Sequence, residues 1–356
     1  MKKNIKKYKI KISSTIRDAI SKIDEMGIGF AVCIDEKDIV VGVVSDGDFR
    51  RAILTGIKLD DSVSEIVNRD FVFIPKLHTR AEIIKIFKRG IVQCIPVIEN
   101  NFLIDIITEE SFFLGKPLSL NKRNFNLPVV IMAGGKGARL DPFTRILPKP
   151  LVPLGNKAII EVIMEEFNRY SVDNFIVSIN HKARMIKAYF ADHPSNFKIE
   201  FLSENIPLGT AGALHFLKGK VKGTFFVTNC DILVKEDYAN MIEFHEKGDY
   251  ALTLIAAIQH HIIPYGVCKI QNGGELASIT EKPKHDLLVN TGMYILNSST
   301  LELIPENEYF DMTDLIKTLK ENNQKVGLYP VSQASWIDIG QIDEYAQAIS
   351  KMNIQY

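Results

Sequence analysis

A glycine-rich segment near residue 135 offers the clearest chemistry in the sequence. Val129 to Met132 is predicted to form a buried strand, and the residues GGKGARL follow at positions 134–140. Glycines at a strand exit let backbone N–H groups approach phosphate oxygens closely, because no Cβ intervenes. Lys136 and Arg139 add positive charge beside them. The segment matches neither the Walker A loop nor the GxGxxG motif, so it indicates a phosphate site of another kind.

Two carboxylates lie where a metal ion could be held. Asp231 ends an apolar run that begins at Thr224, and Asp338 lies in the segment WIDIG. Mg²⁺ prefers hard oxygen ligands, keeps several waters and needs few protein contacts, which suits phosphoryl chemistry. Each aspartate alone is more often the cap of a loop, so metal binding depends on the two acting as a pair.

These side chains need elements to position them, and the second part of the chain alternates apolar strands with amphipathic helices. This alternation predicts a Rossmann-like, mostly parallel sheet covered by helices, with ligands beyond the carboxyl ends of the strands. A helix is expected over 159–170, and a last helix near 344–352. The strands are expected at 127–132, 174–179, 198–202, 224–228, 251–257 and 289–296.

The first part of the chain contains an internal repeat. Thr15 and Thr79 each open a helical pattern, and each helix is followed by two strands, at 30–34 and 39–44 and again at 94–98 and 102–107. Two copies of one small α/β unit explain this, since each copy alone buries too little apolar surface. The polar segment 115–126 is predicted to link a module at 1–114 to a larger domain at 127–356.

Composition limits the partners. The 356 residues include 43 Lys+Arg and 43 Asp+Glu, so no overall field attracts nucleic acid or an anionic membrane. The four cysteines lie far apart without a CxxC pair, which argues against a zinc site or a disulfide framework and fits a reducing compartment. No apolar stretch approaches the roughly 20 residues of a membrane span. A soluble cytoplasmic protein is expected.

The segment GGKGARLDPFTRILPKP, at positions 134–150, resembles the signature of the sugar-1-phosphate nucleotidyltransferases. The resemblance runs from about Asn126 to the C-terminus. It implies a Rossmann-like α/β fold and the reaction of an NTP with a sugar 1-phosphate, which gives an NDP-sugar and pyrophosphate.

The resemblance also implies roles for individual residues. Arg139 would stabilise the β- and γ-phosphates, and Lys149 would contact the α-phosphate. Asp231 and Asp338 resemble the two aspartates that bind Mg²⁺, while Lys282 would contact the phosphate of the sugar. The residues expected to bind the nucleotide are Ala133, Gly134, Gly135, Lys136, Gly137, Asn180, Gly209 and Thr210, and those expected to bind the sugar are Tyr265, Gly266, Glu281, Asn290 and Thr291.

The N-terminal repeat resembles a pair of CBS domains, which are modules that sense adenosyl ligands. Ser45 and Asp48 match the positions that contact ribose hydroxyls in that family, and a carboxylate can accept hydrogen bonds from both hydroxyls. The second copy, which begins at Thr108, lacks the aspartate. The repeat therefore predicts one site for an adenine nucleotide effector, with a structural or dimerising role as the alternative, and a homo-oligomer is expected.

A CBS pair ahead of this catalytic domain resembles the guanylyltransferases that form GDP-glucosamine for legionaminic acid in bacteria. This favours GTP and glucosamine 1-phosphate, or a related amino hexose, as substrates for surface-glycan synthesis. Mannose or glucose 1-phosphate, with GTP, CTP or UTP, is the alternative. A nucleotide sensor without catalytic activity is a hypothesis of another class, which the presence of Arg139, Lys149, Asp231 and Asp338 disfavours.

Overall fold

The computed structural model describes residues 5–88, 92, 94–112, 125, 127–193, 197–341 and 345. The predicted linker at 115–126 and the helix expected near 344–352 lie almost entirely outside this range. No helix within the described part of the chain is long and apolar enough to span a membrane.

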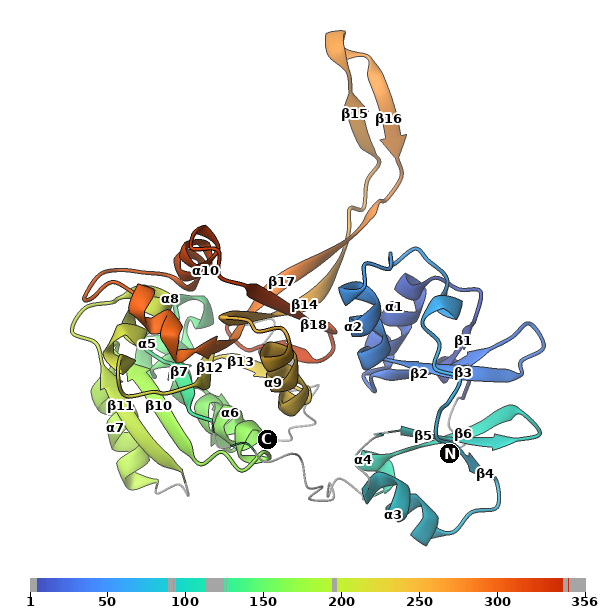
Figure 1. Cartoon of the computed structure of the whole chain (residues 1–356), viewed down its shortest axis with the longest axis horizontal. Helices are drawn as coiled ribbons and strands as arrows, with labels where there is room; N and C mark the ends of the chain where they lie inside the picture. The colour runs from blue at the N-terminus through green and yellow to red at the C-terminus, as the bar shows by residue number, and fades with distance from the viewer. Residues whose placement is uncertain are drawn as a thin grey trace.

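The N-terminal part consists of two small three-stranded sheets of the same design (Figure 1). In each, the first strand runs parallel to the second and the second antiparallel to the third. This confirms the predicted repeat. The first copy contains η1 (Ile5–Tyr8), β1 (Lys9–Lys11), α1 (Ile16–Met26), β2 (Phe30–Ile34), β3 (Val40–Ser45), α2 (Asp46–Leu54) and η2 (Val63–Glu65), and the second contains β4 (Ile74–Pro75), α3 (Arg80–Lys88), β5 (Cys94–Glu99), β6 (Phe102–Thr108) and α4 (Glu109–Phe112).

Reciprocal hydrogen bonds start the first helix of each copy. The Asp18 amide donates to the Thr15 hydroxyl over 3.1 Å, and the Thr15 amide donates to the Asp18 carboxylate over 3.3 Å. Thr79 and Glu82 make the same exchange in the second copy. These bonds satisfy amides that have no partner within the helix, which explains why both helices begin where the sequence predicts.

The second part is built on a seven-stranded sheet in the order β11-β10-β7-β12-β17-β14-β18. Four of its six strand pairs are parallel, which confirms a mostly parallel sheet. The strands are β7 (Val129–Met132), β10 (Asn174–Ile179), β11 (Lys198–Ser203), β12 (Thr224–Asn229), β14 (Leu252–Ile262), β17 (Lys284–Asn297) and β18 (Val326–Val331).

The helices and short elements of this part complete the architecture. The helices are α5 (Phe143–Ile146), α6 (Ile159–Asn168), α7 (Ala183–Asp192), α8 (Gly209–Gly212), α9 (Tyr238–Lys247) and α10 (Met312–Glu321). The short elements are η3 (Ala138–Leu140), η4 (Lys149–Leu151), β8 (Pro153–Leu154), β9 (Lys157–Ala158), η5 (Ala213–Leu217), β13 (Ile232–Val234), β15 (Val267–Ile270), η6 (Asn272–Gly274), β16 (Leu276–Thr280), η7 (Ser298–Leu303) and β19 (Trp336–Asp338).

Two apolar cores lie on opposite faces of the large sheet. Successive residues of a strand face opposite sides, and Phe225 and Phe226 on the central strand β12 show this directly. Phe225 belongs to the core with Leu214 and Leu315, whereas Phe226 packs among the aromatic rings of the other core. The sheet is therefore covered on both faces, as the alternation of strands and helices predicts.

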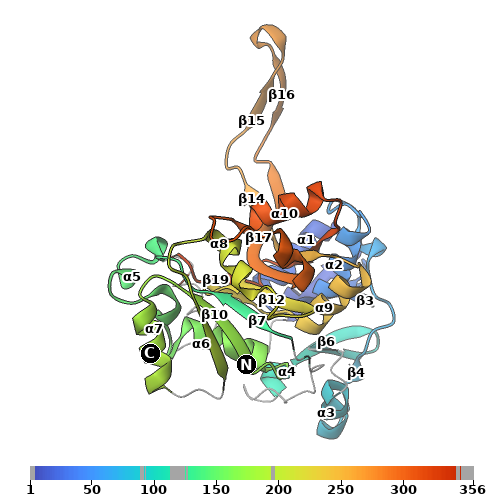
Figure 2. The ribbon, with the colours of Figure 1, turned by 60° about the vertical axis from the view of Figure 1, so that its left-hand side comes forward.

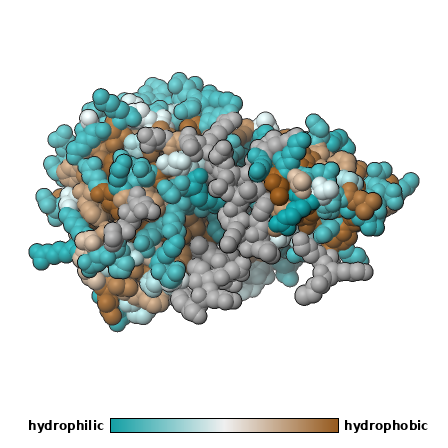
Figure 3. Space-filling view, turned by 90° about the horizontal axis from the view of Figure 1, so that it is seen from below, coloured by the Kyte–Doolittle hydropathy of each residue, from teal (hydrophilic) through white to brown (hydrophobic). Residues whose placement is uncertain are grey.

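Two strands extend beyond the predicted limits and form a projecting arm. β14 and β17 continue as an antiparallel pair past the sheet and lead into the β15–β16 hairpin, which projects from the body (Figures 1 and 2). The expected strands at 251–257 and 289–296 are too short, because backbone pairing continues from Ile258 with Leu288 to Ile262 with Lys284. Ile258 is buried and the His260–Asp286 pair is partly buried, whereas most other residues of the extension are exposed. Viewed from below, the body itself has a largely hydrophilic surface with scattered apolar areas (Figure 3).

The core on the Phe226 side makes a direct prediction for stability. Phe226→Ala should lower the free energy of unfolding by about 3–5 kcal/mol, because it empties a fully buried ring site at the centre of the sheet. Urea denaturation measures the change. Phe102→Ala, at a ring that is 41% exposed, is the matched control and should cost under about 1 kcal/mol. Equal effects of the two variants would contradict this description of the core.

Candidate functional site

The glycine-rich segment leaves the carboxyl end of β7, between β10 and β12. The Ala133 amide donates to the Ser178 carbonyl over 2.9 Å, which ties the start of the segment to the end of β10. Gly137 has a φ of 69°. A Cβ there would lie 2.9 Å from the Cβ of Lys149 and 3.0 Å from Cγ2 of Thr144. Glycine is thus required by both conformation and space, and the loop packs against the stem of Lys149.

Lys149 begins η4, and its side chain extends from beside the glycine-rich loop to the end of β12. Its ammonium forms a hydrogen-bonded ion pair with the Asp231 carboxylate, just beyond β12. The Lys149 and Asp231 side chains are only 13% and 4% exposed. A buried charge needs a partner of opposite charge, and Lys149 and Asp231 are partners for each other.

Asp338 lies beside Asp231 because β13 and β19 pair antiparallel, with Ile232 opposite Asp338. The Ile339 amide donates to the Asp231 carbonyl over 2.9 Å. A Cβ on Gly340 would lie 2.2 Å from Oδ2 of Asp231 and 2.8 Å from Oδ1 of Asp338, so both carboxylates face the space above this glycine. The structure brings the two aspartates together.

Four charged side chains interact electrostatically at this site, namely those of Asp338, Asp231, Lys149 and Arg139. Burial raises the pKa of Asp338 above its ordinary value, and the nearby charge of Asp231 raises it further. The Gly340 amide, Lys149 and Arg139 lower the same pKa. Arg139 itself is exposed, as expected for a side chain that could reach out to a ligand. The chemistry of the place is that of a partly neutralised pair of carboxylates.

A thiol lies next to this pair but is not suited to nucleophilic chemistry. Burial raises the pKa of Cys230 to about 12. The reactive form of cysteine is the thiolate, so this thiol is inert near neutral pH.

The two carboxylates fit a Mg²⁺ ion whose remaining ligands would come from the substrate and water. Asp231 and Asp338 supply hard oxygen ligands around the space above Gly340. Across the described part of the chain, no group of three or more His, Cys, Asp or Glu side chains could hold a metal ion. An ion bound by two carboxylates would take its other ligands from phosphate oxygens and water, as Mg²⁺ commonly does.

Two of the expected nucleotide-binding residues, Gly134 and Asn180, lie next to each other where β7 and β10 end. A Cβ on Gly134 would lie 3.3 Å from the Cβ of Asn180 and 2.8 Å from a Glu204 oxygen. The Asn180 amide group donates to the Glu204 carbonyl over 2.8 Å. Gly134 and Asn180 are thus neighbours at the ends of β7 and β10, and their role in nucleotide binding stays a prediction.

Gly209 and Thr210 begin the short helix α8, and a carboxylate holds its start. The amide and the hydroxyl of Thr210 both donate to Oδ1 of Asp311, over 2.9 and 3.0 Å, and the Thr210 amide is the main cause of a lowered pKa for Asp311. Gly209 has a φ of 82° and no room for a Cβ beside the Phe310 carbonyl. Asp311 and Glu204 were not predicted as site residues, because a carboxylate that holds backbone amides has no sequence signal of its own.

Asn290 and Thr291 lie on β17 where it passes the end of β12. The Asn290 amide group donates to the Tyr294 hydroxyl over 2.7 Å, and the Thr291 hydroxyl donates to the Ile255 carbonyl over 2.8 Å. Gly292 has a φ of 87°, and a Cβ there would lie 2.5 Å from the side-chain nitrogen of Asn229. This part of the expected sugar-binding set therefore adjoins the strand that leads to Asp231.

The rest of the expected sugar-binding set lies elsewhere. Tyr265 and Gly266 lie opposite Glu281 and Lys282 at the base of the projecting hairpin, where a Cβ on Gly266 would lie 3.0 Å from a Glu281 oxygen. Tyr265 is 73% exposed. The structure brings these four residues together with one another at the base of the β15–β16 hairpin, which projects away from the body that contains β13 (Figure 1).

The two expected effector residues of the N-terminal module contact each other. Asp48 accepts hydrogen bonds from the Ser45 amide over 2.9 Å and from its hydroxyl over 2.7 Å, and it also pairs with Arg51. The carboxylate is buried and starts helix α2. In the second copy, Thr108 and Ser111 exchange bonds between hydroxyls and amides without a carboxylate. Only the first copy offers an acidic group at this position.

Two family models match the two parts of this chain. A family model described as nucleotidyl transferase matches residues 128–354, and a CBS domain model matches residues 1–55 and 63–114. The chain is 28% identical to a UTP–glucose-1-phosphate uridylyltransferase of Synechocystis sp. over 63% of its length. It is 31% identical to a mannose-1-phosphate guanyltransferase of Yarrowia lipolytica, also over 63%. The matches span 62% and 65% of those two relatives.

A solved structure resembles the second part of the chain. The crystal structure of HddC from Yersinia pseudotuberculosis superposes with a TM-score of 0.51 at 30% identity. The match covers 64% of this chain and 99% of that one.

The space above Gly340 can be tested directly. Gly340→Ala would place a methyl group 2.2 Å from Oδ2 of Asp231 and should displace both carboxylates. We expect the rate of reaction at this site to fall by at least about 100-fold, the effect of disturbing preorganised charge at a reaction centre. Circular dichroism should show an unchanged fold. Pyrophosphate release within two-fold of the wild type would contradict the described geometry.

Proposed function

The chain belongs to the nucleotidyl transferase family, and on this premise we propose that it transfers a nucleotidyl group from an NTP to a sugar 1-phosphate. An oxygen of the sugar phosphate attacks the α-phosphorus of the NTP. The bond between this phosphorus and the oxygen that bridges to the β-phosphate breaks, and pyrophosphate leaves. The observation that carries the proposal is the convergence of the glycine-rich loop, Lys149, Asp231 and Asp338 at the end of the central strands.

The residues of the site supply positioning and charge. The amides of the glycine-rich loop and Arg139 would hold the leaving phosphates, and Lys149 would contact the α-phosphate. A Mg²⁺ ion held by Asp231 and Asp338 would offset the charge that develops on the transferred group. A phosphate oxygen is already anionic near pH 7, so neither a general base nor a covalent intermediate is needed. The rate would come mainly from alignment and electrostatic stabilisation.

We propose GTP as the nucleotide and glucosamine 1-phosphate, or a related amino hexose phosphate, as the acceptor. A mannose-1-phosphate guanyltransferase among the relatives supports guanine, whereas a uridylyltransferase at similar identity supports the alternative of UTP with a hexose phosphate. Glu281 and Lys282 stay proposed sugar-binding residues. For that role, the hairpin must approach Asp231 and Asp338. In a homo-oligomer, these two aspartates could belong to a neighbouring chain.

We propose that residues 1–114 form a regulatory module and that residues 127–356 form the catalytic domain. The CBS match supports an adenine nucleotide effector in the first copy, because a ribose would compete with Ser45 for the Asp48 carboxylate. Placing the enzyme in the cytoplasm remains part of this proposal.

The reaction is tested through the metal-binding pair. Asp231→Asn should lower pyrophosphate release by at least about 100-fold, because it removes a negative charge that would hold the Mg²⁺ ion and keeps the side-chain volume. The assay combines GTP, UTP and CTP with glucosamine, mannose and glucose 1-phosphates. Asp192→Asn, on the exposed end of α7, is the matched control and should behave as wild type. Nucleotide binding without release for any wild-type pair would instead indicate a sensor.

The effector site is tested by binding. Asp48→Asn should weaken the affinity for an adenine nucleotide by at least about ten-fold, because a neutral amide loses the charge-assisted hydrogen bonds to ribose. The amide oxygen can still accept from the Ser45 amide, so α2 should remain folded. Isothermal titration calorimetry with AMP, ADP and ATP measures the change. Wild-type affinity in this variant would place the effector site elsewhere or support a purely structural module.

A further inference from the structure

One ribbon holds the two aspartates together. β13 and β19 contribute only three residues each, and their pairs are Ile232 with Asp338, Leu233 with Ile337 and Val234 with Trp336. A two-stranded ribbon of this length is barely stable alone, so its ends must be fixed by neighbours. Asp231 and Asp338 lie at one end. The separation of their carboxylates therefore depends on what holds the other end.

The other end is closed by Glu236 and Ser335. The Lys235 amide donates to the Ser335 carbonyl over 2.7 Å, and the Ser335 hydroxyl donates to Oε1 of Glu236 over 2.9 Å. The Glu236 carbonyl accepts from the Tyr170 hydroxyl over 3.0 Å. The Glu236 carboxylate thus joins the two strands across the end that lies away from the aspartates.

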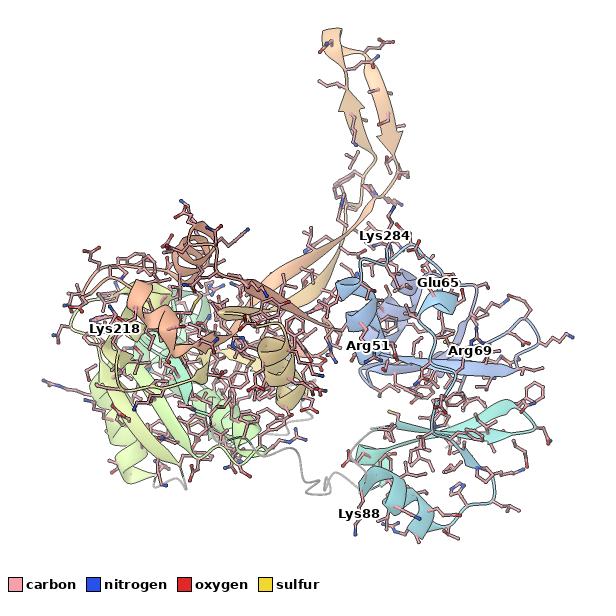
Figure 4. The ribbon with its side chains drawn as sticks, in the orientation of Figure 1. Arg51, Glu65, Arg69, Lys88, Lys218 and Lys284 are labelled. Atoms are coloured by element: carbon pink, nitrogen blue, oxygen red, sulfur yellow. The ribbon has the colours of Figure 1, made fainter. Side chains whose placement is uncertain are left out.

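A cation from the N-terminal module faces this carboxylate. Nη1 of Arg50, on α2, lies 3.6 Å from Oε2 of Glu236, and the two side chains are 14% and 12% exposed. The Arg50 guanidinium also lies over the Tyr329 ring, 4.6 Å from its centre. α2 packs beside β18, which carries Tyr329 (Figure 1). Arg51, the next residue of the same helix, is labelled in Figure 4.

Two other carboxylates lie at this contact. Asp46 lies near Asp24, Glu236 and Arg50, and burial is the main cause of its raised pKa, whereas Arg50 lowers it. Asp24 accepts a long hydrogen bond of 3.4 Å from the Ala334 amide, in the turn before β19. Burial raises the pKa of Glu236, whereas Arg50 and the Ser335 hydroxyl lower it. Without Arg50, the protonated form of Glu236 would be favoured.

We propose that Arg50 is a positioning residue for the metal-binding aspartates, supplied by the N-terminal module: by pairing with Glu236 it fixes the far end of the β13–β19 ribbon. The role in metal binding rests on the proposed function, whereas the hold on the ribbon does not. The N-terminal module is then part of the catalytic scaffold. Arg50 lies two residues from Asp48 on the same helix. A ligand that binds at Asp48 could therefore change the positions of the metal-binding aspartates through the Arg50–Glu236 contact.

Hydrogen exchange in the full chain tests the hold on the ribbon. In Arg50→Met and in Glu236→Gln, the amides of 232–236 and 335–340 should exchange at least about ten-fold faster, because local opening becomes easier. Exchange in β7 and β10 should stay unchanged, which separates this role from general destabilisation. The double variant should exchange no faster than the faster single variant. Lys58→Met, at an exposed lysine of the same module, is the matched control.

Activity tests the consequence for the metal. The Mg²⁺ concentration that gives half-maximal pyrophosphate release should rise about ten-fold in Arg50→Met, the usual effect of removing a residue that orients a metal ligand. Arg50→Lys should recover part of the loss. Trp336 is the only tryptophan and lies on β19, so its fluorescence during titration with Mn²⁺ alone gives a second measure that needs no substrate.

The outcomes separate the two hypotheses. Wild-type exchange over 232–236 and 335–340 in folded Arg50→Met would overturn the inference, whatever the assay shows. Faster exchange together with wild-type Mg²⁺ and Mn²⁺ dependence would also overturn it, since the ribbon would then move without moving the aspartates. If the wild-type protein releases no pyrophosphate with any substrate pair, the proposed function fails, while exchange and Mn²⁺ titration still decide the role of Arg50.

Discussion

The antiparallel pairing of β13 with β19 is the constraint on which the site depends. It joins the segment after the central strand β12 to a segment more than a hundred residues later, and it places Asp231 beside Asp338. Neither aspartate could hold a metal ion alone at this point, because the other ligands must come from substrate and water. The large sheet supplies the rigid platform, but the short ribbon sets the distance between the two carboxylates.

Glycines allow the remaining parts to approach this ribbon. Gly137 lets the loop close on the stem of Lys149, and Gly340 leaves the space that both carboxylates face. Gly292 permits β17 to pass the side chain of Asn229. At each position an added Cβ would lie under 3 Å from an atom of a residue at the site. The site is therefore built by close backbone approach, with few large side chains.

Much of the fold could be predicted from the sequence, and the reasons differ between elements. The strands at 30–34 and 174–179 have the predicted bounds because their apolar residues are buried. The arm is not predicted, since most residues beyond Ile258 and their partners on β17 are exposed, so no run of buried apolar residues marks them in the sequence. The aspartate pair was expected from a resemblance. Glu236 was not, because a buried carboxylate that joins two strands looks like any surface acid in the sequence.

The ion pair between Lys149 and Asp231 has a consequence for the proposed reaction. The Lys149 ammonium balances the Asp231 carboxylate, which reduces the repulsion between Asp231 and Asp338. A divalent ion held by Asp231 and Asp338 would balance these carboxylates in its place, which would leave the Lys149 ammonium for a phosphate oxygen of the substrate. The charge of Asp231 would thus be balanced by a lysine in one state and by a ligand in the other, so that two uncompensated carboxylates would not face each other in either state.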